Sequence, residues 1–304
     1  MSNSRTKNIF LILFWVMIAS IAGYFLYGGI ITGSINFEPK HTGEPNVVLY
    51  DIDVNNAVTS VTINWVAGGV KILPTTGSQI RIVEKAYEPI DHSKWATVST
   101  DNGNLLITSK NKPLFNFLGL LTKSTYLEVY LPITGSYSLV KLTGVSGAYS
   151  VNELYAEMTQ ITLTSGSLNY TDSYSTLLSL NMTSGSATIS SSTILSSSIR
   201  MTSGQLDYHA DTLNFSATMT SGQSSITFGS TNPASFYLAM TSGQSTINLN
   251  GTESFSVKVD KTSGVFDPQF AYVKNDKIYS YQSGGPQYGI QMTSGSVDFI
   301  LSAH

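Results

Sequence analysis

The sequence predicts an all-β protein: a parallel β-helix (β-solenoid) with rungs of about 19–21 residues, preceded by one N-terminal transmembrane helix. Three observations predict this fold. A short motif recurs at a near-constant interval, apolar and polar residues alternate on both sides of the motif, and one long apolar run lies near the N-terminus.

The recurring motif is the tripeptide Thr-Ser-Gly, preceded by one diverged copy, Val-Ser-Gly. The motif glycines are Gly147, Gly166, Gly185, Gly204, Gly222, Gly243, Gly264 and Gly295. The steps between them are 19, 19, 19, 18, 21, 21 and 31 residues. Repetition at such a period indicates a solenoid in which each copy is one structural unit.

The residues that flank each glycine predict short strands. Around Gly204, the apolar residues are Ile199, Met201, Leu206 and Tyr208, and most other copies are apolar at the same places. This alternation is typical of a strand with one buried face. The inward set resumes only two residues after the glycine, so we expect the glycine to form a corner, which its backbone freedom allows.

A return path of about ten residues completes each copy, with a third apolar pair such as Leu213 and Phe215. Rungs of parallel strands stack about 4.8 Å apart, so equivalent positions should form columns. We expect an interior methionine column, a second inward column of the serines before each glycine, and an outward threonine ladder. The crossover preference predicts a right-handed coil. The alternative, antiparallel hairpins, would reverse the chain direction in alternate copies.

The N-terminus reads as a membrane anchor. We predict a cytoplasmic tail at 1–8, a transmembrane helix at 9–32, which is long enough for the ~30 Å of bilayer hydrocarbon, and a linker at 33–46. Arg5 and Lys7 precede the apolar run, so the positive-inside tendency places the rest of the chain outside the cell membrane of a bacterium. The alternative is a signal peptide cleaved after Ser20-Ile21-Ala22.

The exported part divides into a less regular segment, 47–143, and the Thr-Ser-Gly segment, 144–304. The strand that ends in Leu131-Pro132, the Val145-Ser146-Gly147 turn and the later glycine corners resemble the bacterial putative-adhesin family of unknown function, which includes LiaG-like membrane-anchored β-solenoid proteins. The resemblance runs from about Val58 to Phe299. It implies an envelope protein with a β-solenoid domain, and it implies no activity.

Composition argues against several classes of function. The net charge of −3 and the 12% share of charged residues disfavour a nucleic-acid partner. The absence of cysteine excludes thiol chemistry and thiolate metal sites. The histidines occur singly, without the spacing of metal ligands; they are His41, His92, His209 and His304. Three aspartates share the third position after a glycine but lie on non-adjacent copies, so we expect solvated charges; they are Asp207, Asp267 and Asp298. We predict no catalytic residue, no metal site and no cofactor.

Two departures from regularity are the best leads to binding. The 31-residue step holds an insert whose aromatic residues form a candidate interaction loop: Phe270, Tyr272, Tyr279, Tyr281 and Tyr288. We expect this insert to cap the open end of the solenoid, and recognition by projecting tyrosines is the alternative. The apolar segment 114–121 should likewise cap the other end, or else meet the outer leaflet or a partner.

These observations predict a non-enzymatic adhesion, interaction or envelope-sensing module, with an envelope protein or a surface glycan as its partner. The alternative is a polysaccharide-binding or carbohydrate-active β-helix. Aligned acids, or aromatic residues along one face of the solenoid, would favour this alternative.

Overall fold

The computed structural model describes residues 44–55, 57–110 and 124–302. The described strands lie in one compact unit, Pro45–His304. Its N-terminal strands are β1 (Val47–Val54), β2 (Ser60–Trp65), β3 (Gly68–Thr75), β4 (Ile80–Ala86), β5 (Thr97–Asp101), β6 (Asn104–Thr108), β7 (Thr125–Pro132), β8 (Tyr137–Gly144) and β9 (Ala148–Asn152), with one short 3-10 helix, η1 (His92–Lys94). The central strands are β10 (Tyr155–Leu163), β11 (Ser167–Thr171), β12 (Tyr174–Met182), β13 (Ser186–Met201), β14 (Gln205–Met219), β15 (Gln223–Phe228), β16 (Ser235–Met240) and β17 (Gln244–Asn250). The last strands are β18 (Phe255–Lys261), β19 (Val265–Gln269), β20 (Val273–Asn275), β21 (Ile278–Tyr281), β22 (Gln287–Met292) and β23 (Ser296–Ser302). The predicted all-β class is confirmed.

Several predictions fall on other parts of the chain. The predicted tail 1–8, the transmembrane helix 9–32, most of the linker 33–46 and the apolar segment 114–121 lie outside the described residues. Over the three described ranges, no helix combines the length and hydrophobicity needed to cross a bilayer.

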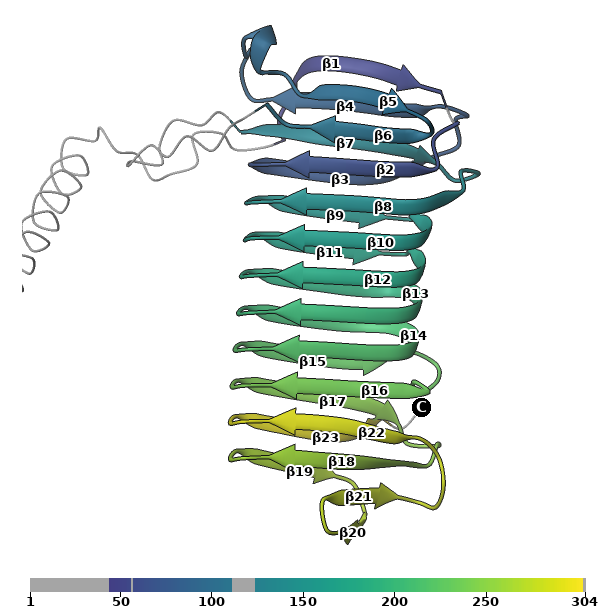
Figure 1. Ribbon diagram of the computed structural model, residues 1–304, viewed down its shortest axis with the longest axis vertical. Helices are drawn as coiled ribbons and strands as arrows, with labels where there is room; N and C mark the ends of the chain where they lie inside the picture. Colours follow the sequence, from purple (N-terminus) through teal and green to yellow (C-terminus); the bar gives the residue numbers. More distant parts are fainter. Residues whose placement is uncertain (1–43, 56, 111–123, 303–304) are drawn as a thin grey trace, which may run out of the picture. The chain divides into compact units, whose positions relative to one another are not determined.

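Successive copies of the motif stack as parallel strands in register (Figure 1). β10 pairs with β8 on one side and β12 on the other, so Ile161 stands between Leu142 and Leu180. β11 likewise lies between β9 and β13, and Tyr170 stands beside Val151. Each copy therefore supplies one rung, and the antiparallel-hairpin alternative is wrong for the repeats.

The predicted inward positions form the core. The methionine column is at most 4% exposed along its length, over Met182, Met201, Met219, Met240 and Met292. Lys261 takes the methionine place in one copy; it is exposed and its Nζ donates to the carbonyl of Gly264 at 2.9 Å. The apolar columns bind neighbouring rungs to each other, because the burial is continuous from copy to copy.

The corner glycines adopt a backbone that other residues rarely reach. Gly185 has φ +113°, and a Cβ there would lie 2.0 Å from the carbonyl oxygen of Gly166 in the preceding rung. Both the conformation and the close backbone approach therefore require glycine. The same column continues upstream, because a Cβ on Gly147 would lie 1.9 Å from the carbonyl oxygen of Gly68. Gly68 is thus a corner that the tripeptide search missed.

The serine before each corner glycine does not face inward, contrary to the prediction. Ser184 is half-buried, and its hydroxyl donates to the carbonyl of Thr164 in the preceding rung at 3.4 Å. The serine already lies on the corner rather than on the inner face of the strand, because the turn begins before the glycine. An interior serine pair exists at another position, where Ser224 Oγ donates to Ser245 Oγ at 2.7 Å. The predicted outward threonines, such as Thr164, are exposed.

A second corner explains the single step of 18 residues. Glu153, Asp172 and Ser191 occupy this corner with φ +50° each. The next rung has no residue opposite Ser191: Ser190 pairs with His209, and Ser192 pairs with Ala210, the residue directly after His209. That rung is one residue shorter because it turns this corner without a left-handed residue.

The return path also differs in one detail from the prediction. Phe215 is buried at 2% exposure, but Leu213 is 48% exposed. A third corner lies between Thr212 and Phe215, where two consecutive residues face outward. The predicted apolar pair is therefore one core residue and one surface residue.

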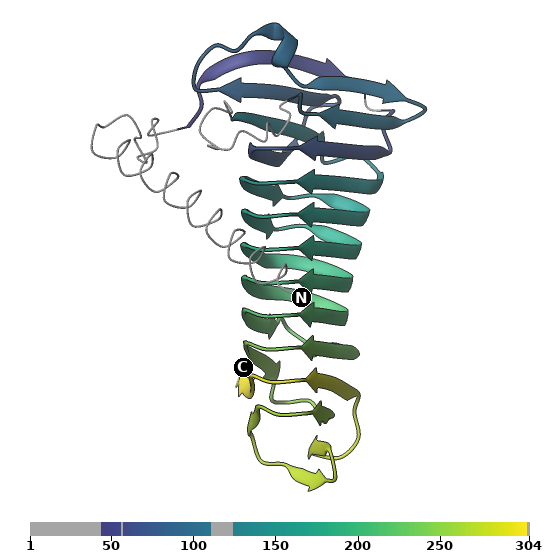
Figure 2. The same ribbon diagram turned by 60° about the vertical axis from the view of Figure 1, so that its left-hand side comes forward.

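The last rung in the sequence is not the last in space. β22 lies between β16 and β18, and β23 lies between β17 and β19 (Figures 1 and 2). The segment from Ser296 to Ile300, close to the end of the sequence, is therefore paired on both sides. The 31-residue step makes this possible, because it is long enough to lead the chain around the end and back.

The N-terminal end shows the same interposition. β2 lies between β6 and β8, and β3 lies between β7 and β9. Antiparallel strands then close this end, because β4 pairs with β7, β1 with β4, and β5 with β6. At the other end β21 pairs antiparallel with β18, and β20 with β21. The part of the 31-residue step before β22 thus lies at the end of the stack, as expected of a cap (Figure 1).

Candidate functional site

The five aromatic residues of the predicted interaction loop occupy different environments. Tyr288 lies on β22, is fully buried, and donates its hydroxyl to the carbonyl of Pro233 at 2.8 Å. It belongs to the core, because β22 is inserted between two rungs. The other four belong to residues 270–286, which include the β20–β21 hairpin and are called here the terminal cap.

Three of these residues seal the end of the core. The ring of Phe270 lies 5.4 Å from the ring of the buried Phe255 and 5.6 Å from that of Tyr281. Tyr281 donates its hydroxyl to the carbonyl of Gly251 at 2.8 Å. The ring of Tyr279 lies 4.9 Å from that of Phe266. Such edge-to-face contacts between rings stabilise a closed end of the stack.

Tyr272 and the adjacent Val273, at the start of β20, are the most exposed large apolar residues of the terminal cap and are called here its tip. Tyr272 is 46% exposed and Val273 is 74% exposed. The ring of Tyr272 nevertheless packs 5.2 Å from the ring of Tyr279. Lys274 Nζ lies 5.1 Å from the centroid of the Tyr279 ring. The tip therefore presents apolar and aromatic surface next to a hairpin whose rings contact the closed end of the stack.

Charges near the terminal cap neutralise each other in part. Asp260 on β18 lies 2.8 Å from Lys277 and 3.5 Å from Lys258. The hydrogen bond from Lys277 holds the pKa of Asp260 below its ordinary value. These groups are exposed, so they orient the hairpin on β18 rather than form a reactive centre.

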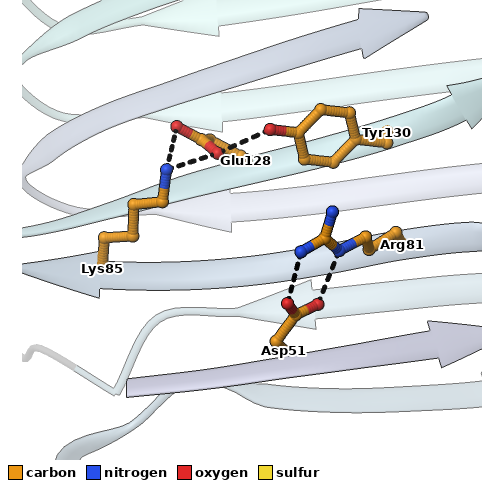
Figure 3. Close-up of polar contacts among 5 residues, drawn as sticks. All are labelled: Asp51, Arg81, Lys85, Glu128 and Tyr130. Carbon is orange, nitrogen blue, oxygen red and sulfur yellow. Dashed lines mark hydrogen bonds and ion pairs between the residues drawn. The ribbon is translucent and has the colours of Figure 1, made fainter. Parts of the chain in front are cut away.

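A second group of polar residues lies on the outer face of β1, β4 and β7 (Figure 3). Arg81 donates Nε to Asp51 at 2.7 Å. Lys85 donates to Glu128 at 2.8 Å, and the Tyr130 hydroxyl donates to the same carboxylate at 2.8 Å. Of these three strands, the one that ends in Leu131-Pro132 was predicted from the sequence, and none of the polar residues was singled out. The available signal was the alternation of charged residues with apolar ones in 80–85 and 126–130.

Electrostatics identify this group as a set of satisfied ion pairs. The hydrogen bond from Arg81 is the main cause of the lowered pKa of Asp51. Burial favours the neutral form of Glu128, but the bonds from Lys85 and Tyr130 outweigh it and lower the pKa of Glu128. Both carboxylates are therefore ionised and engaged, and the group joins three strands rather than offering a free acid or base.

The remaining candidate residues do not form a site. His209 is exposed on β14, the ring of His92 lies 4.0 Å from that of Trp95, and His41 and His304 lie outside the described residues. Asp267 pairs directly with Asp298 across β19 and β23, so these two lie on adjacent rungs, contrary to the prediction. Asp207 and Asp267 are exposed and Asp298 is half-buried. Across the described ranges, no group of three or more His, Asp or Glu residues is placed to hold a metal ion.

A known protein family matches most of this stack of rungs. The family model described as Toastrack DUF4097 matches residues 58–299. This chain belongs to the Toastrack DUF4097 family. The match covers the same residues as the resemblance to the adhesin family, and that resemblance is confirmed.

The Toastrack match begins just before β2 and ends within β23, so it includes both interposed rungs. It leaves out β1, which adds an antiparallel strand at one end. Curated proteins include no match to this chain.

Solved structures similar to this Toastrack protein share little sequence with it. One is described as a "putative cell adhesion protein" from Clostridium sporogenes ATCC 15579, at 13% identity and a TM-score of 0.28, covering 85% of this chain and 100% of that chain. Another is described as a "putative adhesin" from Bacteroides fragilis NCTC 9343, at 12% identity and a TM-score of 0.45, covering 85% and 100%. A third is described as a "putative lipid binding protein" from Parabacteroides distasonis ATCC 8503, at 9% identity and a TM-score of 0.40, covering 85% and 98%.

Proposed function

We propose that this Toastrack protein is a non-enzymatic adhesion or interaction module that recognises an envelope partner through the tip of its terminal cap. The observation that carries the proposal is the exposure of Tyr272 and Val273, at 46% and 74%, on a hairpin supported by buried aromatic rings. Exposed apolar side chains on a rigid support cost little entropy when they bind. Among the described residues, the carboxylates of Asp51, Glu128 and Asp260 are engaged by basic side chains, so these three offer no free acid or base.

The proposed place of action is the outer side of a bacterial cell membrane. The apolar run at 9–32, preceded by Arg5 and Lys7, supports an anchor with a cytoplasmic N-terminus. The stack of rungs would then present the terminal cap to the envelope.

The test is cross-linking in intact cells with a reagent that does not cross membranes. The full chain is compared with the double variant Tyr272→Ser, Val273→Ser, which changes only exposed side chains. Val145→Ser is the matched control, because Val145 is also an exposed apolar residue, at 41%, but lies on a corner glycine motif. We expect a specific partner that the double variant loses and the control keeps.

Two results would contradict the proposal. Failure of the reagent to label the full chain would argue against the outer location. A partner captured equally by the double variant would move recognition away from the terminal cap.

A further inference from the structure

One edge of the solenoid carries four large exposed apolar side chains on four consecutive rungs. Tyr155, Tyr174, Leu195 and Leu213 are 54%, 41%, 43% and 48% exposed. β10, β12, β13 and β14, which carry them, are neighbours in the stack. These four residues are called here the tyrosine–leucine edge.

The members of the edge are close because the rungs are in register. Tyr155 pairs directly with Tyr174. The column of Tyr155 and Tyr174 continues with Thr193 and then Asp211 in the next two rungs. Leu195 follows Thr193 by two residues, and Leu213 follows Asp211 by two residues. Single exposed apolar residues are ordinary on protein surfaces. Four of them on consecutive rungs, as two pairs offset from each other by two residues along the strands, form a patch, and such patches mark binding surfaces.

A hollow of about 200 Å³ opens on this edge, lined by Tyr174, Leu195 and Leu213 together with Thr193, Asp211 and Thr231. Within the described chain, the hydroxyls of Thr193 and Thr231 have no side-chain hydrogen-bond partner. Both the backbone N of Ser230, at 2.9 Å, and its hydroxyl donate to Oδ1 of Asp211. The other carboxylate oxygen of Asp211, Oδ2, has no donor within the described chain. The hollow thus combines apolar walls with two hydroxyls and a carboxylate oxygen that are available to a ligand.

The exposed charged residues near this edge are all negative. The exposed acids near the edge are Glu153, Glu157, Asp172 and Asp211. Arg200 is the only lysine or arginine between residues 144 and 257, and it lies on the strand that leads to the glycine corner. An anionic polymer would be repelled here, whereas a neutral or amine-bearing ligand would not.

We propose that the tyrosine–leucine edge binds a glycan chain that carries no negative charge, lying along the solenoid axis. Each sugar ring has an apolar face, which suits the side chains of Tyr155, Tyr174 and Leu213. Its hydroxyls suit the available groups of Thr193, Thr231 and Asp211. Rungs about 4.8 Å apart present one contact residue per step, which matches an extended chain of repeating rings. The carboxylates add attraction for sugars that bear free amines.

A second copy of the chain or an apolar peptide would use the four apolar residues equally well. A glycan brings an apolar ring face and hydroxyls at every ring, so it covers the apolar residues and satisfies the hydroxyls and the carboxylate oxygen together, whereas a purely apolar partner would leave these groups dry at a cost in binding free energy. This difference favours the glycan. The site is distinct from the terminal cap, so it stands independently of the proposed protein partner.

The test is titration of the full chain in detergent with four tetrasaccharides: chitotetraose, its fully deacetylated form, cellotetraose and tetragalacturonate. We expect binding of the neutral chains, tighter binding of the amine-bearing chain at low salt, and no binding of the uronate. Tyr174→Ala should weaken binding by about ten-fold or more, as for other central aromatic contacts. Asp211→Asn keeps an acceptor for Ser230 and should reduce mainly the preference for the amine.

Matched controls separate this site from others. Tyr237→Ala removes another partly exposed tyrosine, at 39%, and should leave the affinity unchanged. The Tyr272→Ser, Val273→Ser variant should also bind the glycans normally, even if it loses a protein partner. Binding of none of the neutral or amine-bearing chains would overturn the proposal, as would equal binding of tetragalacturonate or by the Tyr174→Ala variant. Self-association of the full chain that Tyr174→Ala abolishes would assign the edge to a second copy instead.

Discussion

At the scale of single residues, the corner glycines restrict the sequence most strictly. At Gly185 the left-handed φ of +113° and the 2.0 Å approach to Gly166 act together. A flexible side chain in the way could move, but a backbone carbonyl in the middle of a stack cannot move without displacing the adjacent rung. This explains why the motif keeps its glycine while its threonine and methionine places vary.

Gly185→Ala should therefore destabilise the unit by about 2 kcal/mol or more, since it adds both backbone strain and a clash. The urea concentration at half-unfolding measures the effect. Gly77→Ala is the control, because a Cβ at Gly77 would meet only the Thr75 hydroxyl, at 3.3 Å. It should change stability by less than about 0.5 kcal/mol. Equal effects of the two substitutions would contradict the role of the corner.

Glu84 shows how one buried residue sets a pH dependence. It is 1% exposed and accepts a hydrogen bond from the Ala96 backbone N at 2.8 Å. Burial raises its pKa above the ordinary 4.5, although bonds from Ala96 and Thr125 oppose the rise. The folded state thus holds this proton more tightly than the unfolded chain does. The contribution of neutral Glu84 to the free energy of unfolding is therefore complete below the ordinary pKa of 4.5, and it is lost as pH rises through the raised pKa of the folded state.

Glu84→Gln should remove this dependence, because glutamine keeps the acceptor for Ala96 and does not titrate. The stability of the native chain relative to the variant should fall as pH rises from about 4 to about 7. Urea unfolding of both chains across this range measures the difference. Parallel curves would show that Glu84 does not titrate within it.

At the scale of elements, the interposed rung β22–β23 is the unusual feature. It supplies parallel partners to β16 and β17 on one side and to β18 and β19 on the other. In a solenoid each rung is stabilised by its neighbours alone. The outer rung and the terminal cap therefore depend on a segment that the chain makes after them.

A chain that ends at Pro286 should lose order at this end only. Residues 255–281 should become sensitive to protease, because β18 and β19 lose their parallel partners, while the rungs from Tyr137 to Phe228 stay protected. Limited proteolysis with mass spectrometry locates the cuts. The Tyr272→Ser variant, which keeps the rung, is the control. Equal protection of 255–281 in the truncated chain would contradict this dependence.

At the scale of the whole compact unit, the regular rungs and the segments that depart from the repeat have different roles. The regular rungs provide a rigid support, with the ion pairs of β1, β4 and β7 and the aromatic rings of the terminal cap closing its two ends (Figures 1 and 3). The two surfaces proposed to bind are exceptions to the repeat. The tip of the terminal cap lies in the longest step, and the tyrosine–leucine edge lies where the return path turns outward.

The candidate surfaces were only partly predictable. The insert stood out because it broke the period, yet its five aromatic residues divide among core, seal and tip. Tyr155, Tyr174 and Leu195 gave no signal in the sequence, because a residue in the return path can face either way. Leu213 was assigned to the core for the same reason. Its orientation depends on a corner that no glycine marks.

The all-β solenoid, the rung length, the apolar interior columns and most of the glycine corners were predictable from the sequence, because each repeats a local rule of strand alternation and backbone freedom. The order of rungs at the two ends and the place of the corner serines followed from the tertiary structure alone. These depend on which strands pair across long loops. Hydrogen bonding between parallel strands is the same for any rung, so the loop path and the packing of the ends select the partner.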